Sequence, residues 1–333
     1  MKRKGQTGEA FKYIFGIIIG SMFLIFFIGF AYKYMTVSGS KSDAELTNAI
    51  SDELTALSVS LNAQDTLDYS RDLELYISKG VITPESLSIG KQMNKVIFSP
   101  LKIEGREIYI ATKTFELPYK TVNFFYFDDK RTYYVLVYNQ KNPTNEEFAE
   151  ELTEGYASMP SNFDYQLIDE SDLSSNLDSL ATLTKNYEKV RFIFLTESNI
   201  NPESYFENYD IIEVTYTDEE EFNYGEIEFV DGSSIYLTKE MLVGAFISEN
   251  KDEYDYNMEL ALSKLNSITN LYYEKSKFIS TRLPNCDYTS VKTSLNNYKG
   301  YIGNTDTAMT YQSYVNTIEA ANKNLGGECP EIF

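Results

Sequence analysis

An uninterrupted apolar stretch near the N-terminus constrains this chain more than any other feature. Residues 13–32 contain no charge and read YIFGIIIGSMFLIFFIGFAY. As a helix rising about 1.5 Å per residue, this stretch is roughly 30 Å long, which matches the hydrocarbon core of a bilayer. Lys12 and Lys33 flank it and can reach the two interfaces. The sequence therefore predicts a transmembrane helix over residues 13–35, because a buried core helix rarely lacks polar interruptions over this length.

The distribution of charge predicts how the chain is oriented. Residues 1–33 carry a formal charge of +4, whereas the remaining 300 residues carry −25. Basic residues favour the cytoplasmic side, so we expect residues 1–12 in the cytoplasm and the acidic body outside it, after a polar linker over residues 36–43. A cleaved secretory signal is the alternative, but the apolar stretch is longer than such signals use and no clear A-x-A site follows it. We expect a single-pass protein of the cell membrane, with the lipid bilayer as its first partner.

The first residues also contain a processing motif. The sequence KRKGQ at residues 2–6, followed by Glu9 and a long apolar helix, resembles the class III signal of type IV pilin-like and archaellin-like proteins. The likeness covers about residues 1–35, and the same opening is similar to that of archaeal single-pass surface proteins in general. It implies cleavage by a prepilin peptidase between Gly5 and Gln6. Glu9 would then be fourth in the mature chain, whereas the family's glutamate is normally fifth.

Two glycines suggest how the apolar stretch could associate. Gly16 and Gly20 form a G-x-x-x-G pair. Small residues four apart let two helix backbones approach closely in lipid. We therefore treat this pair as a candidate for helix–helix association, with a homo-oligomer or a filament as the product. The pattern is weakly specific, because glycine is common in membrane helices.

The body over residues 44–283 is predicted to be an α/β domain. A helix is expected over residues 43–57, mostly β-structure follows as far as residue 138, and Thr83-Pro84 has the pattern of a helix start. Strand-like and helix-like segments then alternate over residues 132–216, which favours right-handed crossovers and a largely parallel sheet. We expect a mostly parallel sheet with helices on both faces, in a Rossmann-like three-layer arrangement.

The longest expected helix of the body covers residues 252–280. Its apolar residues recur at helical spacing, as Tyr254, Met258, Ala261, Leu262, Leu265, Ile268 and Tyr272. Such a stripe most simply packs on the sheet. A helix that binds a partner is the alternative.

The two cysteines flank a predicted C-terminal helical hairpin over residues 284–333. Cys286 and Cys329 are too far apart in sequence for a C-x-x-C redox motif, and no other ligand type clusters beside them. In an extracytoplasmic body, a structural disulfide is the natural interpretation. Two buried free thiols are the alternative.

Composition excludes several kinds of chemistry. The chain has no His, which excludes Ser-His-Asp and Cys-His catalysis and histidine-ligated metals, and its negative charge argues against nucleic acid as a partner. Acidic clusters at Asp128-Asp129, residues 218–221 and residues 252–255 lack the spacing of an EF-hand. No glycine-rich phosphate loop opens any expected helix. We therefore assign no catalytic residue, no cofactor and no metal.

Two functions from different classes remain. The first is a membrane-anchored, extracytoplasmic structural or interaction protein, pilin-like in its N-terminus and not an enzyme. The alternative is a membrane-tethered enzyme that uses carboxylates or a metal at the carboxyl edge of the sheet. That alternative predicts a concave pocket at this edge, lined by acidic groups with perturbed pKa values.

Overall fold

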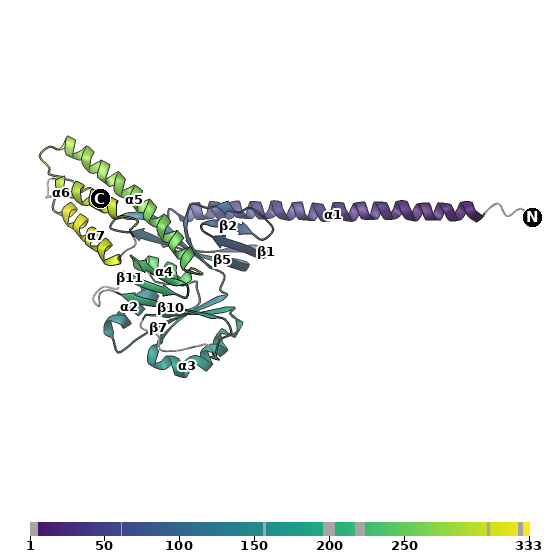
Figure 1. The fold of residues 1–333 in the computed structure, drawn as a ribbon, viewed down its shortest axis with the longest axis horizontal. Helices are drawn as coiled ribbons and strands as arrows, with labels where there is room; N and C mark the ends of the chain where they lie inside the picture. Colours follow the sequence, from purple (N-terminus) through teal and green to yellow (C-terminus); the bar gives the residue numbers. More distant parts are fainter. Residues whose placement is uncertain are drawn as a thin grey trace, which may run out of the picture.

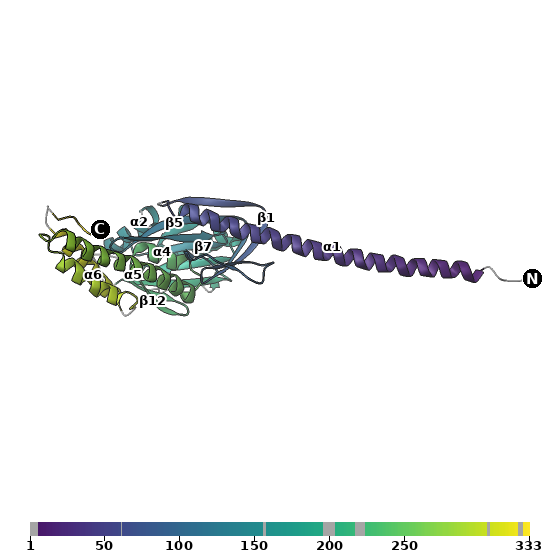
Figure 2. The same ribbon diagram turned by 90° about the horizontal axis from the view of Figure 1, so that it is seen from above.

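The computed structural model describes residues 6–60, 62–155, 158–195, 204–216, 224–304, 307–325 and 329–333. Two six-stranded sheets form the body, one long helix projects from it, and three packed helices lie at the end opposite the N-terminus (Figure 1). The view from above shows the long helix, α1 (Gln6–Leu57), running along the body before it leaves (Figure 2).

Helix α1 packs on the body through its last four turns. Leu46, Ile50, Leu54 and Leu57 recur at helical spacing, are at most 9% exposed, and pack on the first sheet. Figure 1 shows the remainder of α1 extending away from the body. The helix continues through residues 36–43, where the sequence predicts a flexible linker.

The first sheet is almost entirely antiparallel. Its strand order is β3-β2-β1-β5-β6-β4, and only β4 and β6 are parallel. The strands are β1 (Gln64–Ser78), β2 (Val81–Pro84), β3 (Lys91–Gln92), β4 (Val96–Phe98), β5 (Lys102–Glu116) and β6 (Lys120–Asp128). Side chains alternate across β6, so that Phe125 and Phe127 face α1 whereas Phe124 and Tyr126 face the second sheet.

The second sheet is mixed, with the order β12-β11-β10-β9-β7-β8. Its strands are β7 (Thr132–Tyr138), β8 (Tyr165–Asp169), β9 (Lys189–Phe194), β10 (Tyr209–Tyr216), β11 (Gly225–Phe229) and β12 (Gly232–Tyr236). Strands β8, β7, β9 and β10 are parallel, whereas β11 and β12 form an antiparallel hairpin at one edge. Helices α2 (Pro143–Glu154) and α3 (Glu170–Leu183) connect the parallel strands, and a short 3₁₀ turn, η1 (Thr184–Asn186), follows α3. They pack on opposite faces of this sheet.

The predicted fold class is wrong on two points. The α/β body contains two mixed sheets, and not one mostly parallel sheet in three layers, because strands β1 to β6 pair among themselves and, in the part of the chain that the structure describes, helices alternate only with β7, β8 and β9. The transmembrane helix expected over residues 13–35 is not found either. Within the parts of the chain that the structure describes, no helix meets the length and hydropathy needed to cross a membrane.

A short buried helix holds the two sheets together. Helix α4 (Lys239–Ile247) contacts β4, β5 and β6 of the first sheet and β12 of the second. Every residue from Met241 to Ile247 is buried. At Gly244, a built Cβ atom would lie 2.7 Å from the Phe98 ring, so the close approach of α4 to β4 requires glycine.

Three helices complete the fold. They are α5 (Lys251–Arg282), α6 (Thr289–Tyr301) and α7 (Ala308–Lys323). The first half of α5 packs against both sheets, and its second half extends beyond them to pack with α6, which in turn packs on α7 (Figure 1). The predicted C-terminal helical hairpin is therefore joined to α5 in a three-helix unit.

Candidate functional site

A charged groove lies where α1 meets the first sheet. The cavity measures about 570 Å³ and opens between α1, β1, the end of β2 and the β6–β7 turn. It is lined by Asp43, Leu46, Arg71, Asp72, Leu73, Glu74, Leu75, Pro84, Glu85, Ser86, Glu104, Gly105 and Arg131. Five carboxylates and two guanidinium groups therefore line it.

The charges at one end of this groove fix the angle at which α1 leaves the body. Asp43 of α1 is buried, accepts a hydrogen bond from the Ser86 hydroxyl and forms an ion pair with Arg71 of β1. Thr47 donates a hydrogen bond of 2.8 Å to the Asp43 carbonyl one turn earlier. Because Asp43 is largely removed from water, its two partners are needed to compensate for the burial of the charge.

The second cation of the groove joins three parts of the chain. Arg131 donates to Glu104 Oε2 at 2.6 Å, to Asp129 Oδ2 at 2.7 Å and to Glu188 Oε2 at 2.7 Å. Both guanidinium groups of the groove are therefore neutralised by the protein itself. Across the described residues, no group of three or more carboxylates converges closely enough to hold a metal ion.

The carboxyl edge of the parallel strands is where the alternative function, a membrane-tethered enzyme, would have its site. Asp169, at the end of β8, accepts hydrogen bonds from the backbone N–H of Ser171 at 2.7 Å and of Gln140 at 2.8 Å. Hydrogen bonding by Ser171 lowers the pKa of Asp169. The buried Asn145 accepts from the Asn139 N–H and donates to the Leu195 carbonyl, each at 2.7 Å. These polar groups serve the local fold, and the charged groove lies elsewhere.

The Asp128-Asp129 pair is divided by the fold. Asp128 is fully buried at the end of β6, and its Oδ1 accepts from the N–H groups of Asp129 at 2.7 Å and of Lys130 at 2.9 Å. Its Oδ2 has no hydrogen-bond partner, and the same holds for the buried hydroxyl of Tyr134. Burial, reinforced by the charge of Asp129, raises the pKa of Asp128 to about 7. Asp128 is thus a proton-binding group of the interior, while Asp129 pairs with Arg131.

The two other acidic clusters form no common site. Residues 218–221 lie outside the described residues. In the cluster at residues 252–255, Glu253 accepts from Ser78 Oγ at 2.6 Å and from the Lys79 N–H at 2.7 Å, which ties α5 to the β1–β2 turn. Asp255 pairs with Lys251 on the next turn.

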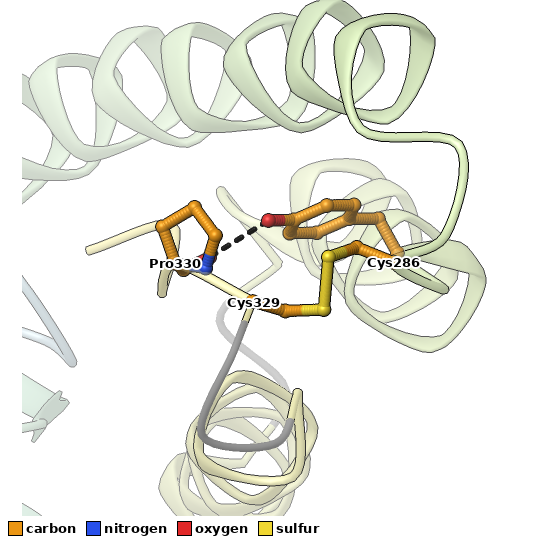
Figure 3. Close-up of a disulfide and its surroundings, with 4 residues drawn as sticks. Cys286, Cys329 and Pro330 are labelled. Carbon is orange, nitrogen blue, oxygen red and sulfur yellow. Dashed lines mark hydrogen bonds between the residues drawn. A yellow bond between two sulfur atoms is a disulfide. The ribbon is translucent and has the colours of Figure 1, made fainter.

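The cysteine pair is joined. Cys286 and Cys329 are bonded at an S–S distance of 2.09 Å and link the start of α6 to the chain after α7, as predicted (Figure 3). The Tyr288 hydroxyl donates to the Pro330 carbonyl at 2.9 Å beside the bridge. The Phe333 ring contacts the Tyr119 and Tyr272 rings, with centroids 5.0 and 5.5 Å away. The C-terminal tail is therefore fixed against the three-helix unit.

The second half of α5 carries exposed apolar residues that the sequence reasoning missed. The predicted stripe is buried from Tyr254 to Leu265, as expected for a core face. Farther along, Leu271 and Phe278 are each 61% exposed on another face of the helix. The Arg282 guanidinium lies 5.3 Å from the Phe278 ring centroid. The sequence feature that could have revealed this surface is the pair Leu271 and Phe278, seven residues apart, on the helix face that also carries Arg282.

The processing and association candidates lie at the free end of α1 or beyond it. Gly5 lies outside the described residues, and Gln6 and Glu9 lie in the first turns of α1. Gly16 and Gly20 follow on the same helix, and no atom approaches the Cβ position of Gly20 within 4 Å. These positions remain predictions.

Comparisons with protein families, with curated proteins and with solved structures found no match to this chain. The function must therefore be argued from the chain's own surfaces.

Proposed function

We propose that this protein is a membrane-attached, extracytoplasmic structural or interaction protein, which uses α1 as its attachment and presents its three-helix unit away from the membrane. The observation that carries this proposal is that the two ends of the molecule differ. A projecting apolar helix lies at one end, and the three-helix unit lies at the other (Figure 1).

The apolar part of α1 supports attachment to lipid. Its exposed side chains are Met22, Phe23, Leu24, Ile25, Phe26, Phe27, Ile28 and Phe30, at 59–71% exposure. Leaving apolar surface in water costs roughly 25 cal/mol per Å², so a row of large side chains on all sides of a helix requires a cover. We propose lipid as that cover, because the side chains surround the helix and do not form one stripe that a single protein groove could bury.

The disulfide supports an extracytoplasmic body. Bridges between cysteines persist in oxidising compartments and are rare in the cytosol. The Cys286–Cys329 bridge closes a loop of 43 residues around α6 and α7, which on their own bury little core. By chain entropy alone, such a closure stabilises by roughly 4 kcal/mol.

The pilin-like motif adds a processing step to this proposal. A prepilin peptidase would cut between Gly5 and Gln6, and Gln6 would then begin the mature chain. Intact-mass spectrometry of the protein from membranes of its native host tests this directly. Loss of residues 1–5 would support the step, whereas a mass that includes them would remove it and leave the attachment proposal unchanged.

Liposome flotation of the full chain tests membrane attachment. The α1 variant replaces Phe23, Ile25 and Phe27 with Asn, at positions that are 59–71% exposed. The control variant replaces Val59, Ile89 and Val230 with Asn, which are 81–84% exposed on the body. We expect wild type and control to float with the vesicles and the α1 variant to stay at the bottom. Flotation of all three chains alike, or of none, would contradict the proposal.

A further inference from the structure

The second half of α5 and α6 form a cationic region on an acidic protein. Residues 260–301 contain six Lys and Arg against two acidic residues, whereas the chain as a whole has a net charge of −21. The cations are Lys264, Lys275, Lys277, Arg282, Lys292 and Lys299. We call residues 260–301 the basic tip. Of these cations, only Lys277 forms an ion pair with a carboxylate among the described residues, with Glu274 at 3.0 Å.

The basic tip also has an apolar centre. Leu271 and Phe278 are 61% exposed, and Leu283 is 39% exposed where α5 ends. Lys277 and Lys299 each lie 5.2 Å from the Tyr273 ring centroid beside them. Apolar residues surrounded by Arg, Lys and Tyr have the composition of a protein-binding surface, in which aromatic residues and Arg are enriched.

A surface of opposite charge is present on the same chain. Helix α3 lies beside β8, the edge strand of the second sheet, and packs on the face opposite to α2. Residues 164–188, which contain β8, α3 and η1, carry six acidic residues and one Lys. We call this surface the acidic edge. One large apolar side chain is exposed on it, Leu183 at the end of α3, at 56%.

The two surfaces lie on different sides of the molecule. In Figure 1 the end of α5 is at the upper left, whereas α3 is at the lower edge, beyond the second sheet. A single chain therefore cannot bring its own basic tip onto its own acidic edge. Two neighbouring copies can, and because the contacting surfaces differ, the pair keeps one free basic tip and one free acidic edge.

We propose that the basic tip of one copy docks on the acidic edge of a second copy, in a repeating head-to-tail contact. Charge complementarity orients the two copies, and the apolar centre at Leu271 and Phe278 meets the exposed Leu183 of the neighbour. This contact names the partner of the proposed interaction protein. It rests on the proposed function, because that function places both copies on one membrane. Attachment to one surface raises the effective concentration of one copy around another.

Charge reversal of the full chain in detergent micelles tests the contact. The tip variant combines Lys277→Glu with Arg282→Glu. The edge variant combines Asp172→Lys with Asp178→Lys, both exposed on α3, the helix that carries Leu183, and in no ion pair among the described residues. The matched control, Lys91→Glu with Arg106→Glu, changes as much charge as the tip variant does, on the first sheet. Circular dichroism shows that each variant is folded, and sedimentation velocity gives the dissociation constant.

We expect the tip and edge variants each to associate at least tenfold more weakly than wild type and control. Mixing the two variants restores association, because the unchanged tip of one meets the unchanged edge of the other. Raising the salt from 50 to 500 mM also weakens the wild-type contact at least tenfold, because salt screens surface charges.

Three results would overturn the inference: a wild type that stays monomeric, reversals that leave association unchanged, or a mixture that associates no better than its components. The measurement does not depend on membrane attachment, which flotation tests separately. Failure of this contact and failure of the proposed function are therefore distinguishable.

Discussion

Replacing the buried Asp128 with Asn is expected to change how the stability of the body depends on pH. Asp128 is fully buried, its Oδ1 accepts two backbone N–H groups, and its Oδ2 has no partner. Burial raises its pKa from 3.8 to about 7. Because this pKa is higher in the folded chain, the folded state keeps a proton that the unfolded state has released.

The sign and size of the effect follow from linkage. The contribution of Asp128 to the free energy of unfolding falls as the pH rises from about 4 to about 7. Above pH 7 this contribution changes little. A shift of about 3 units corresponds to roughly 4 kcal/mol at pH 8. Asn keeps the Oδ1 acceptor and cannot ionise, although its amide adds a buried N–H donor that costs about 1–2 kcal/mol. We therefore expect Asp128→Asn to stabilise the body by about 2 kcal/mol at pH 8 and not at pH 4.5.

Urea unfolding at several pH values measures this difference. The chain has no Trp, so the fluorescence of its 28 Tyr reports the transition. Asp178→Asn, on the exposed surface of α3, is the control and is expected to leave the free energy of unfolding unchanged at each pH. If Asp128→Asn destabilises the body equally at pH 4.5 and pH 8, the carboxyl is not protonated in the folded chain and the reasoning is refuted.

Three further variants test the interior and the disulfide, the first two by the same unfolding assay and the third by amide hydrogen exchange. Arg191→Leu is expected to cost about 3–5 kcal/mol, because it leaves Asp210 with Lys189 alone and removes the donor to the carbonyls of Phe246, in the last turn of α4, and of Ser248 and Glu249 after it; a loss below 1 kcal/mol would contradict this. Gly244→Ala is expected to cost about 1–3 kcal/mol through overlap with the Phe98 ring, and a neutral effect would refute the close approach. Replacing Cys286 and Cys329 together with Ser is expected to speed amide hydrogen exchange in residues 329–333, and unchanged exchange would show that the bridge does not fix the tail.

Local patterns predicted individual elements of this fold well. The alternation of β7, β8 and β9 with helices and the helices after residue 284 follow from apolar periodicity. Thr83-Pro84 had the pattern of a helix start, yet β2 ends there and pairs with Leu75–Ser78 of β1. The turn between these strands places Lys79 and Gly80 at positive φ, which the dipeptide preference does not reveal. Pairing with β1 therefore makes Thr83-Pro84 the end of a strand and not the start of a helix.

The number of sheets was harder to predict for the same reason. Local periodicity shows that a segment is a strand but not which strand it pairs with, and β1 pairs along much of its length with β5, some 40 residues later. The burial of Asp128 could have been predicted from the sequence. It shares the period-two face of β6 with Phe124 and Tyr126, which lie between the sheets, so strand alternation would have directed it inward.

The surfaces proposed for interaction could be predicted only in part. The charge excess of residues 164–188 and 260–301 is visible in the sequence. The exposure of Leu271 and Phe278 is not, because it depends on α5 extending beyond the sheets that bury its first half.

Labelling of lysines in intact cells tests the central claim most directly. A membrane-impermeant amine reagent is added to cells of the native host, and mass spectrometry compares the labelling of Lys264, Lys277 and Lys299 with that in lysed cells. An extracytoplasmic body predicts equal labelling before and after lysis, on protein that is recovered in the membrane fraction. Labelling only after lysis, or recovery of the labelled protein away from the membranes, would contradict the account.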